Sequence, residues 1–305
     1  MRDIHPEQAP YWLGGLIEAI SVDGGPTDEQ LRLIQALLRG YFGFEEAIDL
    51  VPLSPGDLAR RIPDPSSRLR LVQSLIVLEF MRHPASEVLT ESVERFAAEL
   101  GIDEPMLKVA RRAAEHSREL VMADWSRFRR ATPPEPRLTG VEDDEFTRRI
   151  DALQRSSPGS LGRAFLDFYD RWSLPLPTSD DAHGIGLVNH DFAHVLTDYL
   201  PNSAVDETSL SALITSSTNG DEHFSALVGS LALYEVDLID FDGIDGTKGV
   251  LGRPGAPDVF AEAMRRGAAC THDIVAFDHF AVIDWPLQDV RQTLGVSPRR
   301  VWADE

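Results

Sequence analysis

The richest set of chemically capable side chains lies in residues 187–200, which have the sequence LVNHDFAHVLTDYL. On a helix that turns by about 100° per residue, His194 lies about 40° from His190, and Asp198 and Asp191 follow at about 80° and about 100°. The opposite face is apolar. Histidines four residues apart on a helix bring two ring nitrogens close enough to bind one cation. The segment therefore predicts a metal site on one face of an amphipathic helix.

Two carboxylates share this face and are candidates for catalysis. Asp191 is expected to be a third metal ligand, a hydrogen-bond partner of a ligand, or a base acting on a bound water. Asp198 is expected to act beside it as a second catalytic residue. The alternative is that residues 187–200 form an ordinary solvated polar face of an amphipathic helix. The spacing of the two histidines does not by itself decide between these interpretations.

The elements that must position this segment are predicted to be helices throughout, which makes the fold class all-α. Apolar residues recur at helical spacing along both halves of the chain. Thr27 with Gln30 has the signature of a capping box, Ser86 is a predicted N-cap, and Gly101 is predicted to end a helix. Helices are expected over residues 12–20, 28–38, 65–80, 87–100, 104–128, 160–172, 187–200, 207–216, 222–238, 257–267 and 286–294.

A stretch rich in proline and acid, residues 131–145, separates two halves of different charge. Residues 1–130 contain 16 basic and 21 acidic side chains, whereas residues 131–305 contain 13 and 29. Such a composition is typical of a linker. We therefore predict a helical domain over 1–130, a linker with a connecting helix over 131–155, and a second helical domain over 156–305.

The composition excludes several classes of binding partner and of fold-stabilising bond. The 305 residues have a formal net charge of −21, which argues against nucleic acid or an anionic membrane surface as the main partner. A single cysteine, Cys270, excludes an internal disulfide and fits a reducing compartment. The sequence contains no apolar run long enough to cross a membrane and no secretory signal pattern at its start. We expect a cytoplasmic protein, a small-molecule substrate and a possible homodimer, and the dominance of arginine over lysine suggests a GC-rich bacterial source.

The first half resembles the tellurite-resistance TerB-like domains, which are all-helical. The resemblance covers residues 8–125 and rests on an apolar helix followed by SVDGGPTDEQLRLIQALL, in which Asp23, Gly24 and Glu29 match the acidic motif of that family. The family has been linked to metal binding through its acidic residues. The same residues also suit a turn and a helix start, where acidic side chains favour the helix dipole.

The second half resembles the ubiquinone biosynthesis Coq-four family over residues 156–298. The resemblance rests on HDFAH, on SLGRAFLDFYDRWSLP before it and on PLQDVRQTLGV after it. It implies a metal site at His190, Asp191 and His194, with a glutamate from the following loop. Glu207 is preferred for that ligand over Asp206, with one residue inserted in the loop, and Glu222 is a third candidate. The remaining histidines, among them His183, His223, His272 and His279, are expected to be surface or core residues.

The Coq-four resemblance implies a metal-dependent step on a quinone-like or prenylated aromatic ring, in which a ring carboxyl is replaced by a hydroxyl. Zinc is the expected cation for two imidazoles with oxygen ligands, and iron or manganese would suit oxygen chemistry better. No flavin or nicotinamide motif is present. Two other function classes stay open: a non-catalytic, lipid-binding scaffold that gathers other biosynthetic enzymes, and a stress-response binding module dominated by the first half.

Overall fold

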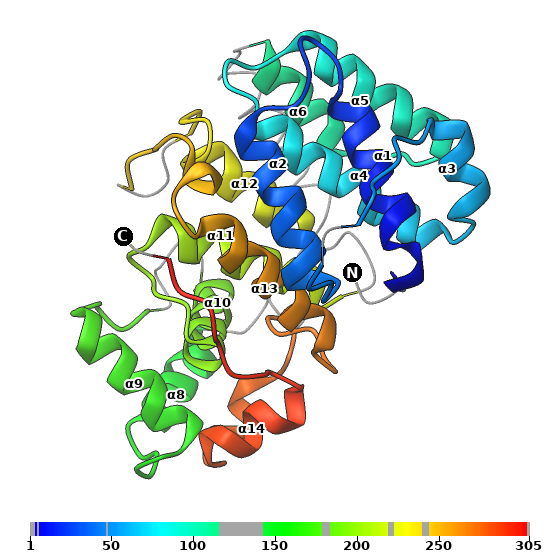
Figure 1. Ribbon diagram of the computed structural model, residues 1–305. Coiled ribbons are helices and arrows are strands. Elements are labelled where there is room, and N and C mark those ends of the chain that lie inside the picture. The colour runs from blue at the N-terminus through cyan, green and yellow to red at the C-terminus, as the bar shows by residue number, and fades with distance from the viewer. Residues whose placement is uncertain are drawn as a thin grey trace. The chain divides into compact units, whose positions relative to one another are not determined.

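The computed structural model describes residues 4, 6–46, 48–115, 143–178, 184–218, 223–239 and 244–303 (Figure 1). The described residues form α-helices joined by short 3-10 and π-helical turns, and they contain no strand beyond two isolated bridges. The predicted all-α fold class is therefore confirmed. None of the described helices is both long enough and apolar enough to span a membrane.

The chain divides into two compact units that do not follow the order of the sequence. One unit comprises Met1–Ala131, Asn202–Ala268 and Arg300–Glu305, and the other comprises Thr132–Pro201 and Ala269–Arg299. The sequence suggested two consecutive domains with one boundary, whereas each of these units is built from separate stretches. Most of the predicted linker, residues 131–142, lies outside the described residues, and α8 (Asp143–Leu153) supplies the expected connecting helix.

The first unit is organised around α4 (Pro65–Phe80), a helix that is buried on nearly all sides. Asp64 caps its first turn, because the Ser67 N–H donates to the Asp64 carboxylate at 2.7 Å. Apolar side chains all round this helix pack against neighbours on every face, as expected for a central helix. The neighbours in this unit include α1 (Ala9–Ile20), α5 (Glu87–Leu100), α6 (Met106–Ala114) and α12 (Phe224–Tyr234).

Local signals fix the ends of several of these helices. Thr27 and Gln30 form the predicted capping box at the start of α2 (Asp28–Ala36). Ser86 caps α5, and Gly101 ends it with a left-handed φ of 72°. The sequence analysis missed α3 (Pro55–Arg61), although Ser54 caps it in the same way. Of the helix predicted over 104–128, only Met106–Ala114 is described as helix, and residues 116–128 lie outside the described part.

Three helices later in the chain complete the first unit: α11 (Ala204–Ser216), α12 and α13 (Ala256–Ala269). The α11 helix is buried along almost its whole length and packs most extensively against α12. On its other side α13 approaches so closely that a Cβ placed on Gly267 would lie 2.1 Å from the Leu213 carbonyl oxygen. Glycine at this position is therefore what allows the two helix backbones to touch.

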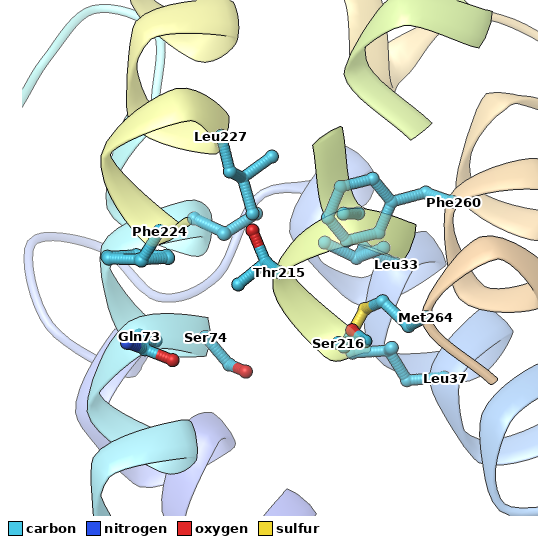
Figure 2. Close-up of a pocket in the computed structure, with 12 residues that line it drawn as sticks. Leu33, Leu37, Gln73, Ser74, Thr215, Ser216, Phe224, Leu227, Phe260 and Met264 are labelled. Carbon is cyan, nitrogen blue, oxygen red and sulfur yellow. The ribbon is translucent and has the colours of Figure 1, made fainter. Parts of the chain in front are cut away.

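A small cavity lies inside the first unit, lined mainly by apolar side chains such as Leu33, Phe224, Phe260 and Met264 (Figure 2). Its volume of about 20 Å³ is room for a single water molecule and not for a substrate. The buried Ser216 hydroxyl lines it and has no hydrogen-bond partner among the described residues. A water there would satisfy that hydroxyl, so the cavity is a packing feature of the core.

The second unit contains α8, α9 (Leu161–Trp172), α10 (Gly184–Thr197) and α14 (Leu287–Leu294). The α9 helix begins at the N-cap Ser160 and packs against the other three helices. Its Phe165 ring lies 4.3 Å from that of Phe192 on α10, measured between ring centroids. This aromatic contact anchors the apolar face of α10 on α9.

Candidate metal centre

The two histidines of the HDFAH motif lie on one face of α10, as the spacing predicted. The Nε2 atoms of His190 and His194 are 3.1 Å apart, and His194 is almost fully buried with 2% of its surface exposed. Bonds from imidazole nitrogen to zinc measure about 2.0–2.1 Å, so one ion can reach both of these nitrogens. The predicted pairing of the imidazoles is therefore present in the structure.

A backbone hydrogen bond orients the His194 ring. Its Nδ1 lies 2.8 Å from the Tyr199 carbonyl oxygen, an atom that can only accept a hydrogen bond. In a neutral ring the proton must then sit on Nδ1, which leaves the Nε2 lone pair pointing at His190. Metal-binding histidines are commonly held in this way, because a hydrogen bond to the distal nitrogen fixes both tautomer and orientation. The Phe168 ring stacks on the His194 ring, with centroids 5.7 Å apart and planes tilted by 21°.

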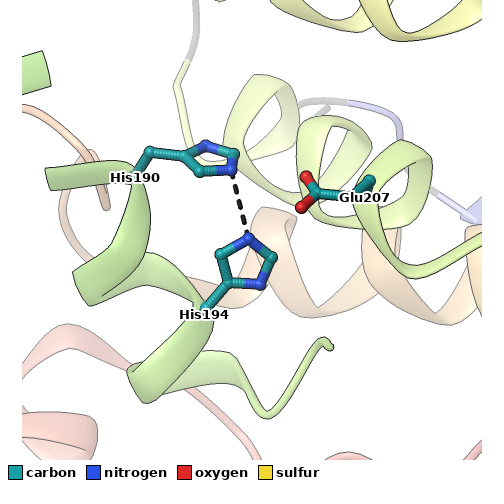
Figure 3. A group of neighbouring side chains, drawn as sticks. All are labelled: His190, His194 and Glu207. Atoms are coloured by element: carbon teal, nitrogen blue, oxygen red, sulfur yellow. Dashed lines mark hydrogen bonds between the residues drawn. The ribbon is translucent and has the colours of Figure 1, made fainter. Parts of the chain in front are cut away.

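Glu207 supplies a carboxylate to this pair. One ligand atom each from His190, His194 and Glu207 lie within 4.8 Å of one another, and Figure 3 shows the carboxylate pointing at the two rings. Glu207 belongs to the first turn of α11, thirteen residues after His194 in the sequence. Among the described residues, this is the only group of three or more potential ligands that close together.

The neighbouring carboxylate candidates have different surroundings. Asp206 is buried in the first turn of α11, where its N–H donates to the hydroxyl of the N-cap Ser203 at 3.0 Å. Among the described residues, Glu207 and not Asp206 is grouped with the two histidines. Glu222, the third candidate, lies outside the described residues. The preference for Glu207 over Asp206 therefore agrees with the structure.

Asp191 is held from α9 and is not part of the three-residue group. It is buried, with 7% of its surface exposed, and its carboxylate accepts a hydrogen bond from the Tyr169 hydroxyl. A carboxylate next to a ligand histidine and fixed by a tyrosine is suited to holding or moving a proton beside the centre. The predicted position of Asp191 next to the site is present, while its role as a ligand stays a prediction.

Asp198 is not placed as the helical projection assumed. The α10 helix ends at Thr197, and Asp198 adopts a left-handed φ of 63° just beyond it. Its carboxylate forms an ion pair with Arg291 at 2.6 Å. The projection treated residues 187–200 as one continuous helix, and that is wrong for the last three residues. A catalytic role for Asp198 stays a prediction without the shared face that suggested it.

The electrostatics on the α11 side reflect the charge of Glu207. Burial and the negative charge of Glu207 raise the pKa of Tyr234 to about 12. Tyr234 lies in the last turn of α12, the helix packed against α11, and the Thr208 and Ser230 hydroxyls, 3.0 Å apart, join the two helices nearby. A tyrosine with so high a pKa keeps its proton at neutral pH. Its hydroxyl is therefore a permanent donor in the neighbourhood of Glu207.

The donor set fits a functional cation better than a structural one. Two imidazoles and one carboxylate are the protein ligands of several catalytic zinc sites, which keep a further position open for water or substrate. The same set, in a facial arrangement, also binds non-haem iron. Structural zinc sites use four protein ligands, usually including cysteine, and the chain has only Cys270.

Several residues around the centre were not recognised from the sequence. Phe168, Tyr169, Tyr199 and Arg291 reach the α10 helix or the turn that follows it. The contribution of Tyr199 is a backbone carbonyl, which no side-chain pattern reveals. Tyr169 offers the one available signal, because a buried tyrosine hydroxyl needs a hydrogen-bond partner.

Comparison of the chain with protein-family models, with curated proteins and with solved structures gives no match in any of the three. The resemblances to the TerB-like and Coq-four families therefore stay predictions that rest on the quoted motifs.

Proposed function

We propose that this protein is a metal-dependent enzyme that binds one divalent cation through His190, His194 and Glu207. Its proposed substrate is a quinone-like or prenylated aromatic molecule with a ring carboxylate, and zinc is the proposed cation, with iron or manganese as alternatives. The observation that carries this proposal is that three potential ligand atoms lie within 4.8 Å of one another, two of them imidazole nitrogens and one a carboxylate oxygen. The donor set supports it, because it leaves room for a substrate oxygen.

The surroundings of the histidines support an aromatic substrate. Phe168 is half-buried and stacks on His194 with planes tilted by 21°, which places an apolar ring beside the centre. Asp191 and Tyr169 provide a hydrogen-bonded acid–base pair one residue from His190. An apolar wall with a few placed polar groups is the usual composition of a small-molecule site.

The proposed step is loss of the ring carboxyl group as CO₂. A proton first adds to the ring carbon that carries the carboxyl group. The bond from that carbon to the carboxyl carbon then breaks, CO₂ leaves, and the electron pair of the bond passes through the ring to a ring oxygen. A bound cation would supply electrostatic stabilisation for the negative charge that develops on the ring oxygen. Asp191 would first take up a proton from solvent on its second carboxylate oxygen and then deliver it, and the hydrogen bond from the Tyr169 hydroxyl would hold the side chain in place. Addition of a hydroxyl would need an external oxidant such as dioxygen.

The test begins with metal content. We expect about one divalent ion per chain in the purified protein by elemental analysis and none in the double variant His190→Ala, His194→Ala. His272→Ala is the matched control, because His272 is exposed and hydrogen-bonds the neighbouring Thr271. An unchanged metal content in the double variant would overturn the site.

The second part of the test is activity on a panel of prenylated hydroxybenzoates, followed as release of CO₂. We expect release by the metal-loaded protein and loss of release in the double variant. Asp191→Asn should bind metal normally and lose at least about 100-fold in rate, since removal of a general acid typically costs 10²–10⁴-fold. Absence of release from every member by a fully loaded protein would contradict the proposed reaction and favour the scaffold class.

A further inference from the structure

We infer that Arg291 and Arg299 are positioning residues for His194, acting through the turn formed by Asp198 and Tyr199. The consequence for metal affinity rests on the proposed function above. The positioning itself concerns only residues of the second unit, and it can be measured in the metal-free protein.

The turn needs support because of its backbone conformation. The α10 helix ends at Thr197, and Asp198 has a φ of 63°, in the left-handed region that residues with a Cβ seldom adopt. Aspartate is among the side chains that tolerate this region best. The Asp198 N–H still donates to the His194 carbonyl at 2.9 Å, so the turn begins directly at the ligand histidine.

Arg291 holds one side of the turn. Its Nη2 donates to the Val195 carbonyl at 2.9 Å and to the Asp198 carboxylate at 2.6 Å. The Arg291 side chain is mostly buried, with 16% of it exposed, whereas the Asp198 side chain is 44% exposed. The contact joins α14 to the last turn of α10 and fixes the Asp198 side chain.

Arg299 holds the other side of the turn. Its Nη1 donates to the Asp198 carbonyl at 3.0 Å, and its guanidinium carbon lies 4.5 Å from the centroid of the Tyr199 ring. An arginine over an aromatic face gains a cation–π interaction in addition to the hydrogen bond. Arg299 is itself buried, with 9% of its surface exposed. The peptide between Asp198 and Tyr199 is thus held on both sides.

The Tyr199 carbonyl oxygen is the atom that orients the His194 ring. The His194 Nδ1 donates to the Tyr199 carbonyl oxygen at 2.8 Å, which fixes the proton on Nδ1 and presents Nε2 to His190. The basic side chains of the C-terminal stretch of the second unit both lie at this turn. Residues 269–299 contain four aspartates and only two basic residues, Arg291 and Arg299, and both reach this one turn.

The direct measurement is the tautomer of His194. In metal-free protein at about pH 8.5, where imidazoles are ordinarily neutral, ¹⁵N NMR separates the Nδ1–H from the Nε2–H form. We expect a single Nδ1–H tautomer in the natural protein and a mixture in Arg299→Ala and in Arg291→Ala. Arg163→Ala is the matched control, because Arg163 forms an exposed ion pair with Asp167 on α9.

Metal affinity is the second measurement, made by competition with a chelator for Zn²⁺. Loss of a partner that orients a ligand typically weakens affinity 10–100-fold, and we expect this from both arginine variants and no change from Arg163→Ala. Arg291→Lys keeps the charge next to Asp198 and should recover part of the loss. Far-UV circular dichroism of each variant identifies any that has failed to fold, and Arg291→Lys or Arg299→Lys then takes the place of the alanine variant at the same position.

Two outcomes distinguish a failure of the positioning role from a failure of the proposed function. An unchanged Nδ1–H tautomer in both alanine variants would overturn the positioning role, whatever the metal affinity. A natural protein that binds no Zn²⁺, while the arginine variants still alter the tautomer, would overturn the proposed function and leave the positioning role standing.

Discussion

A buried histidine lies at each of two faces of α10, and the two imidazole rings have different surroundings. On one face the His194 ring is held at Nδ1 by a backbone carbonyl and directs Nε2 at a second imidazole 3.1 Å away. On the other face His279 is fully buried and stacks on Phe192, with ring centroids 4.7 Å apart and planes tilted by 10°. Phe277 contacts the same ring, and no partner for His279 Nε2 is found among the described residues.

The difference shows which surroundings suit a buried histidine to bind a metal. Both rings are removed from water, so burial alone does not distinguish them. Both rings have an acceptor near Nδ1, which is the Tyr199 carbonyl for His194 and the Asn189 side-chain oxygen, at 3.4 Å, for His279. Only His194 directs its Nε2 at a second imidazole, whereas the His279 ring is packed against Phe192 and Phe277. Burial lowers the pKa of His279 to about 3, and a backbone hydrogen bond at Ile274 and the charge of Asp273 offset this only in part. His279 is a neutral core residue, as expected for the histidines outside the motif.

The largest effect we predict on the His279 side is a loss of stability in acid. An unfolded histidine has a pKa near 6.5, so below that pH the unfolded state binds a proton that the folded state excludes. The contribution of the neutral, buried His279 ring to the free energy of unfolding is fully present above about pH 6.5 and is lost as the pH falls toward 3. Between pH 6.5 and 4.5 this amounts to about 2–3 kcal/mol, at 1.36 kcal/mol for each unit.

The measurement is urea unfolding of the natural protein and of His279→Phe at pH 7.5 and pH 5. Phenylalanine can stack on Phe192 and does not titrate, so we expect the variant to lose less stability between the two pH values. Exposed His272→Gln serves as the control and should behave like the natural protein. Equal pH dependence in the His279→Phe variant would show that the buried imidazole is protonated without cost.

Substitutions of the adjacent residues Glu207 and Asp206 test which carboxylate binds the cation beside His190 and His194. We expect Glu207→Gln to weaken Zn²⁺ binding by about 10–100-fold, because glutamine keeps the size of the side chain and removes the charge. Asp206→Asn should change the affinity less than about threefold, since it lies outside the group formed by His190, His194 and Glu207. Competition with a chelator gives both values, and a larger loss in the Asp206 variant would move the carboxylate ligand to that position.

Sequence predicted best what short-range chemistry controls. The capping box at Thr27, the N-cap at Ser86 and the glycine end at Gly101 are local, and all three are present. The imidazole pair follows from a spacing of four on a helix. Asp198 was misplaced because the helix ends at Thr197, ahead of Pro201, and the Asp198 side chain pairs with Arg291, which lies 93 residues further along the chain. The two interleaved units depend on contacts between distant segments in the same way, and no local pattern encodes them.

The smallest effect we predict is on the fold itself when the cation is removed. The apolar cores of both units are built from side chains packed against one another, among them Trp12, Phe96, Phe165 and Leu213. A chain of 305 residues buries enough surface to fold without a metal. A cation at about 100 times its dissociation constant adds only about 2.7 kcal/mol. Chelation should therefore leave the circular dichroism at 222 nm nearly unchanged and lower Tm by no more than about 10 °C, since 1 kcal/mol shifts Tm by about 2–4 °C in chains of this size. A loss of most of the helical signal would instead assign the cation to the folded core, and the ligand face of α10 would then serve structure as its His279 face does.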